Sequence, residues 1–309
     1  AGFALNGIGG NNDEVEEVSE QIWALAAFFS SSKEVKANEF ETFSRFIYRK
    51  GTSIRALEWV PVVHGDKRKE FETDLSVITG KLTAIWSNDY QNNYQVVNAH
   101  LEYRPVYYIY PENKNKKAFG LDLLSNVDKK IAMELAQKLN KIVSTVPLSI
   151  VQDDMHHPAL LLFFPIRNNQ STKPYLANNN ANNSNEHDKN LLDGYIVAVV
   201  QLAPLFEHIM TNINNEYVNV FIQDISNNER YFLYGNEAHA PDNLSSTQSL
   251  RIFSRKWQIT VTENTSWLLQ NQHWFNWLLL SGATLVGLLL QFFIISIAAY
   301  SIKLNNQLQ

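Results

Sequence analysis

The sequence predicts two α+β units in series, preceded by a helix and followed by a membrane-spanning helix. Three observations support this fold class. A long run near the C-terminus contains no charged residue, an Asn-rich polar stretch lies in the middle of the chain, and strand and helix patterns occur on both sides of that stretch.

The C-terminal run is the clearest element. Residues 275–302 contain no Asp, Glu, Lys, Arg or His. A helix of this length measures roughly 42 Å at about 1.5 Å per residue, and the apolar core of a bilayer is about 30 Å thick. Trp274, Trp277 and Tyr300 stand where interfacial aromatic residues are expected, and Lys303 follows directly. We therefore expect one membrane anchor.

The N-terminal region, residues 1–53, is predicted to be helical. Asp13 followed by Glu16 fits a capping box. Apolar residues then recur at spacings of three and four, namely Val15, Val18, Ile22, Leu25 and Phe29. This heptad pattern predicts a dimer seam between two helices. Because it spans only two heptads, it fits equally an amphipathic helix that packs on its own domain.

The two α+β units are separated by the Asn-rich stretch. Residues 54–167 combine strand patterns with a helix from about Ser125 to Lys141, whose expected core face is Val127, Ile131, Leu135 and Leu139. Residues 168–190 offer almost nothing to bury and are predicted to be a flexible loop. Residues 191–266 repeat a strand, a helix and further strands, which predicts a second unit.

Composition excludes several classes of function. The chain of 309 residues has 26 Lys and Arg against 31 Asp and Glu, a formal net charge of −5. Proteins that bind nucleic acid usually carry a basic face, so no such partner is expected. The absence of cysteine excludes disulfides, cysteine zinc sites and cysteine nucleophiles.

No catalytic or cofactor motif occurs, and no metal site or cofactor is predicted. The densest cluster of metal-ligand types is Asp153, Asp154, His156 and His157. Adjacent His side chains converge on one ion only if the backbone bends sharply, so a solvated turn before a strand explains the cluster as well. The alternative function that rests on this cluster is a hydrolase anchored at the cell surface.

Several segments together resemble the CHASE domain, an extracytoplasmic sensor module of histidine kinases, cyclic-dinucleotide enzymes and adenylate cyclases. They occur in the order of the family and are followed by a membrane span. The segments are Leu25–Phe40, Ile54–Glu72, Glu102–Asn115, Gly120–Asn126, Val146–Pro147, Leu161–Ile166 and Gly194–Leu205. The resemblance implies a long stalk helix that dimerises, a membrane-distal PAS-like unit and a membrane-proximal PAS-like unit.

The resemblance also implies a ligand site in the distal unit. In the plant cytokinin receptors of this family, an Asp in the segment matching GLDLLSN accepts hydrogen bonds from an adenine-type ligand, and the corresponding residue here is Asp122. A second possibility is that Asp122 pairs with a protein group such as Arg55 or a backbone amide. The other expected ligand-binding residues are Tyr107, Leu124, Ile150, Leu161 and Phe163. Phe163 replaces a Thr of those receptors, so a smaller or different ligand is expected.

Taken together, the sequence predicts the ligand-sensing part of a transmembrane receptor in the plasma membrane. Residues 1–273 are expected on the periplasmic or extracellular side, acting as a homodimer that binds a small molecule. A kinase or cyclic-dinucleotide enzyme is expected beyond Gln309, and a second span is expected before residue 1. The fragment itself is predicted not to be an enzyme. A domain that senses a protein partner, or that only dimerises, is the variant of this hypothesis.

Overall fold

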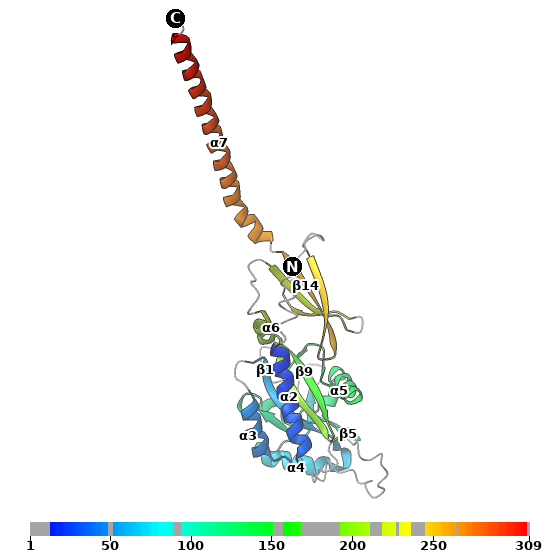
Figure 1. Ribbon diagram of the computed structural model, residues 1–309. Helices are drawn as coiled ribbons and strands as arrows, with labels where there is room; N and C mark the ends of the chain where they lie inside the picture. The colour runs from blue at the N-terminus through cyan, green and yellow to red at the C-terminus, as the bar shows by residue number, and fades with distance from the viewer. Residues whose placement is uncertain are drawn as a thin grey trace.

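The protein has a mixed α and β architecture in which two antiparallel sheets are followed by one long helix (Figure 1). The structure is a computed structural model. It describes residues 13–48, 52–88, 94–150, 157–167, 192–210, 218–226, 229–235, 245–263 and 265–307.

The larger sheet has six strands and forms the centre of the distal unit. Its order is β6 (Tyr108–Tyr110), β1 (Ile54–Pro61), β10 (Gly194–Gln201), β9 (Pro158–Ile166) and β7 (Val143–Ser144), with β8 (Leu148–Ser149) also paired to β9. Strands β1, β9 and β10 are apolar and almost wholly buried, because helices cover both faces of this sheet.

Strand β10 corrects the predicted domain boundary. The prediction placed residues 191–266 in the second unit, but β10 pairs along its whole length with β9 on one side and with β1 on the other. The Asn-rich stretch 168–190 therefore connects two neighbouring strands of one sheet. An antiparallel pair tolerates such a long connection because the entropy of loop closure grows only slowly with length. The predicted flexible loop itself, residues 168–190, lies outside the described residues. Asn-rich composition thus did not mark where a domain ends.

Four helices cover the two faces of the distal sheet. On one face, α2 (Asp13–Ser31) and α3 (Ala37–Ile47) bring the ring of Phe29 within 4.4 Å of Trp59 and the ring of Phe40 within 5.2 Å of Tyr108. On the opposite face α5 (Val127–Leu139) packs on β9 and β7, and Phe71 of α4 (Arg68–Thr79) lies 5.2 Å from the ring of Tyr107. There the Tyr195 hydroxyl donates a hydrogen bond of 3.2 Å to the carbonyl oxygen of Met133 in α5.

The predicted dimer seam is buried inside its own chain. Val18, Ile22 and Leu25 are 0 % exposed, Phe29 is 6 % exposed, and Val15 is half-buried against the same core. These side chains cannot meet a second helix, so the seam prediction was wrong and the packing of an amphipathic helix on its own domain is confirmed. Helix α2 lies along the distal sheet (Figure 1), and the structure does not confirm a long stalk.

Helix α5 also turns a different face inward from the one predicted. Its buried residues are Ala132, Met133 and Ala136. The four residues of the expected core face, Val127, Ile131, Leu135 and Leu139, are exposed. The small side chains of Ala132 and Ala136 allow the helix to pack close to the sheet. The larger apolar side chains of the helix then lie on its outer face.

The smaller sheet has four strands in the order β12 (Tyr231–Tyr234), β11 (Val218–Asp224), β14 (Arg255–Glu263) and β13 (Ser245–Ile252). Helix α6 (Leu202–Met210) follows β10 directly and joins the two sheets. The ring of Phe206 in α6 lies 5.2 Å from the ring of Tyr234 and 5.8 Å from that of Trp257. This sheet forms the predicted second unit without its first strand.

The tip of the β13–β14 hairpin contacts the edge of the distal sheet. The Ser144 amide of β7 donates a hydrogen bond of 3.0 Å to the carbonyl oxygen of Phe253, and the Ser254 hydroxyl donates one of 3.0 Å to the carbonyl oxygen of Ile142. From this contact, β14 runs toward α7 (Thr265–Gln307). One strand thus connects the distal sheet to the C-terminal helix.

Helix α7 contains the predicted anchor. Residues Asn276–Ile297 have a mean hydropathy of 2.3, and none of this stretch is buried in the protein. Within the described residues, it is the one helix that is long and apolar enough to cross a membrane. Figure 1 shows it extending away from both sheets.

Gly194 provides a test of the central position of β10. A Cβ atom at Gly194 would overlap the carbonyl oxygen of Val60. It would also lie 2.7 Å from the Trp59 ring and 2.8 Å from the Pro61 Cα. We expect Gly194→Ala to lower the free energy of unfolding by about 1–3 kcal/mol, because neither neighbouring backbone can yield. The measurement is denaturant unfolding of the full chain in detergent, followed by circular dichroism.

Gly282→Ala is the matched control for this change. No atom lies within 4 Å of a Cβ at Gly282 in α7, so this variant should unfold like the wild type. Equal stability of Gly194→Ala and wild type would contradict the pairing of β10 with β1.

Candidate functional site

Asp122 lies at the centre of the candidate site, directly before the short helix η4 (Leu123–Ser125). Asp122 is 3 % exposed. Its Oδ1 accepts hydrogen bonds from the backbone amides of Arg104, at 2.8 Å, and Leu124, at 3.2 Å. The sequence offered two kinds of protein partner for Asp122, the Arg55 side chain and backbone amides. Among the described residues, backbone amides donate the hydrogen bonds to its carboxylate.

Burial raises the pKa of the Asp122 carboxyl. The two backbone amides and the nearby charges of Arg104 and His100 act in the opposite direction without cancelling this effect. Both backbone amides donate to the same oxygen of Asp122, Oδ1. An additional donor or cation at the carboxylate would offset the cost of keeping it charged and buried.

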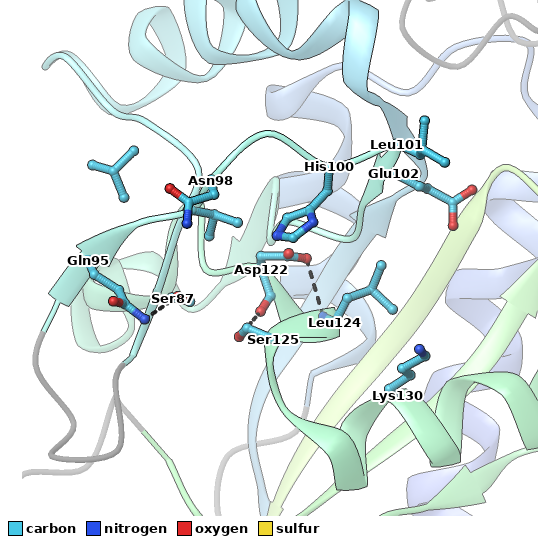
Figure 2. A pocket seen from close by; sticks show the side chains of 12 residues that line it. Ser87, Gln95, Asn98, His100, Leu101, Glu102, Asp122, Leu124, Ser125 and Lys130 are labelled. Atoms are coloured by element: carbon cyan, nitrogen blue, oxygen red, sulfur yellow. Dashed lines mark hydrogen bonds between the residues drawn. The ribbon is translucent and has the colours of Figure 1, made fainter.

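A cavity of about 550 Å³ opens beside Asp122. Its described lining comes from three short strands, the loop between the last two of them, the segment at η4, and α5. It consists of Ser87, Gln95, Val96, Val97, Asn98, His100, Leu101, Glu102, Asp122, Leu124, Ser125 and Lys130. Figure 2 shows the imidazole of His100 next to the Asp122 carboxylate, with Lys130 reaching up from α5. The volume lies within the range of small-molecule sites.

One wall of the cavity is held by Arg68 of α4. Its Nη1 donates hydrogen bonds to the carbonyl oxygen of Val97, at 2.7 Å, and to the Tyr103 hydroxyl, at 3.3 Å. Its Nε pairs with Glu72 at 2.8 Å. The Tyr103 hydroxyl in turn accepts the backbone amide of His100 at 2.7 Å. A single guanidinium thus fixes the segment that carries His100.

A second layer of charged groups lies behind Asp122. Arg104 is 7 % exposed, pairs with Glu102 at 2.5 Å and has its guanidinium carbon 5.9 Å from the centre of the Tyr195 ring. Burial lowers the pKa of the Lys129 ammonium, while the carboxylates of Glu58 and Asp122 act in the opposite direction. The site therefore combines charges of both signs in a mostly desolvated setting.

The structure brings together only part of the predicted ligand site. Asp122 and Leu124 line the cavity, whereas Tyr107, Ile150, Leu161 and Phe163 are buried in the core and are not among its described lining. Phe163 is 0 % exposed and meets the ring of Tyr195 edge-on at 6.1 Å. Its ring therefore packs the sheet and does not narrow the described cavity, contrary to what the sequence predicted.

The residues that sequence reasoning missed are Ser87, Gln95, Asn98, His100, Glu102 and Lys130. Five of them come from strands β3 (Trp86–Asn88), β4 (Tyr94–Val96) and β5 (Glu102–Tyr103) and the segment between β4 and β5. The sequence signal for these residues was the group of polar side chains immediately before Glu102. The residues of that group show no apolar periodicity that would predict burial.

The alternative hydrolase site lies largely outside the described residues. Asp153, Asp154 and His156 belong to an undescribed segment, and His157 stands exposed directly before β9. Within the described residues, no group of three His, Cys, Asp or Glu side chains could hold a metal ion.

Arg68→Lys tests how the cavity wall is held. Lys keeps the charge but cannot reach Glu72, Val97 and Tyr103 together. We expect amide hydrogen exchange in residues 94–103 to accelerate at least ~10-fold, because hydrogen bonds to a charged group are lost there. Arg45→Lys is the control, since Arg45 pairs with Glu41 on an exposed helix surface. Unchanged exchange in Arg68→Lys would show that another contact holds the wall.

Two solved structures show a distant likeness to the chain. An extracellular ligand-binding receptor from Desulfohalobium retbaense has a TM-score of 0.48 and 8 % identity, over 84 % of this chain and 39 % of that chain. The ligand-binding domain of the Pseudomonas aeruginosa amino acid chemoreceptor PctC, in complex with GABA, has a TM-score of 0.42 and 9 % identity, over 81 % of this chain and 93 % of that chain.

No curated protein matches the chain. The model of the CHASE domain matches residues 33–234, which contain the whole distal sheet, η4 and all of the described lining of the cavity. This match covers more than half of the sequence, and the chain therefore belongs to the CHASE domain family.

Proposed function

We propose that this chain is the extracytoplasmic sensing part of a transmembrane receptor and that a small molecule binds in the cavity beside Asp122. The observation that carries the proposal is a buried carboxylate that lines a cavity of about 550 Å³ and whose Oδ1 is held by two backbone amides. Membership of a sensor-domain family supports the same role.

The side chains of the cavity indicate the chemistry of the ligand. Asp122 offers an acceptor for an N–H or ammonium group. His100 and Lys130 can interact with an acceptor on the other side of the same molecule. A small polar molecule that carries both a donor and an acceptor fits these groups and a volume of about 550 Å³.

The fold offers a route from this cavity to the membrane. Helix α5 begins directly after η4 and leads into β7, whose Ser144 contacts Phe253 at the hairpin tip. Strand β14 continues from that tip toward α7. A ligand that favours one position of α5 biases the position of α7 through this chain of contacts.

The remaining parts of the receptor follow from the same proposal. Helix α7 spans the plasma membrane, residues 1–273 lie outside the cytoplasm, and a kinase or cyclic-dinucleotide enzyme follows Gln309. A second span precedes residue 1, and two copies act as a homodimer. Because the seam on α2 is buried, the homodimer uses another surface.

A thermal-shift screen tests the proposal. The full chain in detergent is mixed with a metabolite library that contains amines, amino acids and nucleobases. We expect at least one compound to raise the unfolding temperature, because a ligand that binds only the folded state stabilises it. Arg68→Lys should reduce that shift. If no compound of any class raises the temperature, the ligand-sensing proposal fails.

Asp122→Asn separates binding from folding. The amide oxygen of Asn can still accept both backbone N–H groups, so the fold is preserved, whereas the charge that attracts a donor is lost. We expect the variant to lose the shift produced by any compound found in the screen. A variant that keeps the full shift would remove Asp122 from the site.

The stability of ligand-free Asp122→Asn should depend on pH in a defined direction. The pKa of Asp122 is raised by folding, so ionisation costs wild-type stability as the pH rises above the ordinary pKa of Asp. The variant has no such cost. Its unfolding temperature relative to wild type should therefore rise with pH through this window and level off above the raised pKa. The opposite slope would mean that the native state favours the ionised form.

A further inference from the structure

Helix α7 carries one carboxamide deep inside its apolar stretch. Gln291 is exposed and lies within Asn276–Ile297, six residues before the end of that stretch. Six residues of helix measure roughly 9 Å, so Gln291 lies within the apolar core of a bilayer that α7 spans. Lipid chains neither donate nor accept hydrogen bonds, and the Gln291 side chain therefore needs a polar partner there.

The hydroxyl residues of the same stretch find their partners within the helix. The Ser281 hydroxyl donates a hydrogen bond of 2.9 Å to the carbonyl oxygen of Leu278, and the Thr284 hydroxyl donates one of 2.8 Å to that of Ser281. The carboxamide of Gln291 differs because it has an acceptor oxygen as well as two N–H donors. The backbone N–H groups around it are used by the helix, so this oxygen needs a donor from another side chain.

The donor has to come from outside α7. The side chains that neighbour Gln291 on the helix are those three and four positions away, and all of them are apolar or absent. They belong to Gly287, Leu288, Ile294 and Ile295. Helix α7 also extends away from both sheets (Figure 1), and none of its apolar stretch is buried against them.

The face of α7 that carries Gln291 is suited to a second helix. Residues at heptad spacing on this face are Leu280, Thr284, Gly287, Gln291 and Ile294. Gly287 lies one turn before Gln291, and no described atom lies within 4 Å of a Cβ placed there. Apolar surface alone drives little association in a membrane, whereas small residues allow close approach and polar residues hydrogen-bond across helices. Both features coincide on this face.

A second copy of α7 is the partner that satisfies Gln291 fully. Two copies inserted in one membrane in the same direction are parallel, so a two-fold axis along the membrane normal places equivalent residues opposite each other. A carboxamide is self-complementary, because its N–H group donates to the oxygen of the other copy while its own oxygen accepts in return. Within the described residues, no other helix is long and apolar enough to enter the membrane beside α7.

We propose that two copies of α7 pair in parallel, with the Gln291 side chains hydrogen-bonded to each other and Gly287 at the closest approach of the helices. The inference assigns a surface to the proposed homodimer. It rests on the proposed function in requiring that α7 spans a membrane and that two copies act together, and it requires no ligand.

Cysteine cross-linking tests which face is paired, since the chain has no cysteine of its own. Full-length single-cysteine variants are placed in lipid vesicles and oxidised. We expect disulfides between copies to form faster for Thr284→Cys and Ile294→Cys than for Leu289→Cys and Phe293→Cys. The last two residues lie two positions from Gln291 and thus on the opposite side of the helix.

Substitution of Gln291 tests the hydrogen bond itself. Energy transfer between copies labelled at Gln248→Cys, on the exposed surface of β13, is followed as lipid dilutes the chains. We expect Gln291→Leu to weaken association about 3- to 30-fold, and Gln291→Asn, which keeps the carboxamide, to retain most of it. Ser281→Ala is the matched control, because the Ser281 hydroxyl already bonds within its own helix.

Three results would overturn the inference. Equal cross-linking at all four positions would mean that no face of α7 is preferred. Association of Gln291→Leu as strong as that of wild type would exclude the carboxamide pair. An absence of energy transfer in the wild type would show that another partner, or none, meets Gln291. The ligand screen is independent of all three, since a compound can stabilise the sensing part whether or not α7 pairs, so the two proposals fail separately.

Discussion

The structure depends on the position of β10 between β1 and β9. This strand completes the distal sheet and then continues directly into α6, whose Phe206 packs on the smaller sheet. Without β10, the distal sheet would split into the pair β6–β1 and the group β7, β8 and β9, and the two units would lose their covalent joint. Gly194 at the start of β10 permits the close approach of β1, because a side chain there would overlap the backbone of Val60.

The candidate site follows from how this sheet is covered. The helices α4 and α5 lie on the face opposite α2, and the segments between them reach the edge of the sheet. There, backbone amides hold one oxygen of Asp122 and Arg68 fixes the wall that carries His100. The cavity is therefore polar and open beside Asp122, while Phe163 and Leu161 fill an apolar interior behind it. The short helix η4 marks the boundary between the polar lining of the cavity and the apolar core.

Helix α5 lies between the candidate site and the smaller sheet. Its first turn follows η4, and its end leads to β7, which contacts the tip of the β13–β14 hairpin. Small displacements of such an element are transmitted because packed interfaces change between discrete arrangements and do not deform continuously.

The sequence by itself determined the local features: the apolar run that forms α7, the amphipathic pattern of α2, and the strands β1, β9 and β10. Each depends on composition or on periodicity over a few turns. Asp122 was expected at the site from the resemblance to the CHASE domain, and it lines the cavity. Only the tertiary structure decided that β10 belongs to the first sheet, that Val18, Ile22 and Leu25 face inward, and that α5 buries Ala132 and Ala136 instead of Ile131 and Leu135. These outcomes depend on contacts between residues far apart in the chain, and an apolar periodic pattern does not distinguish a partner in the same chain from one in another.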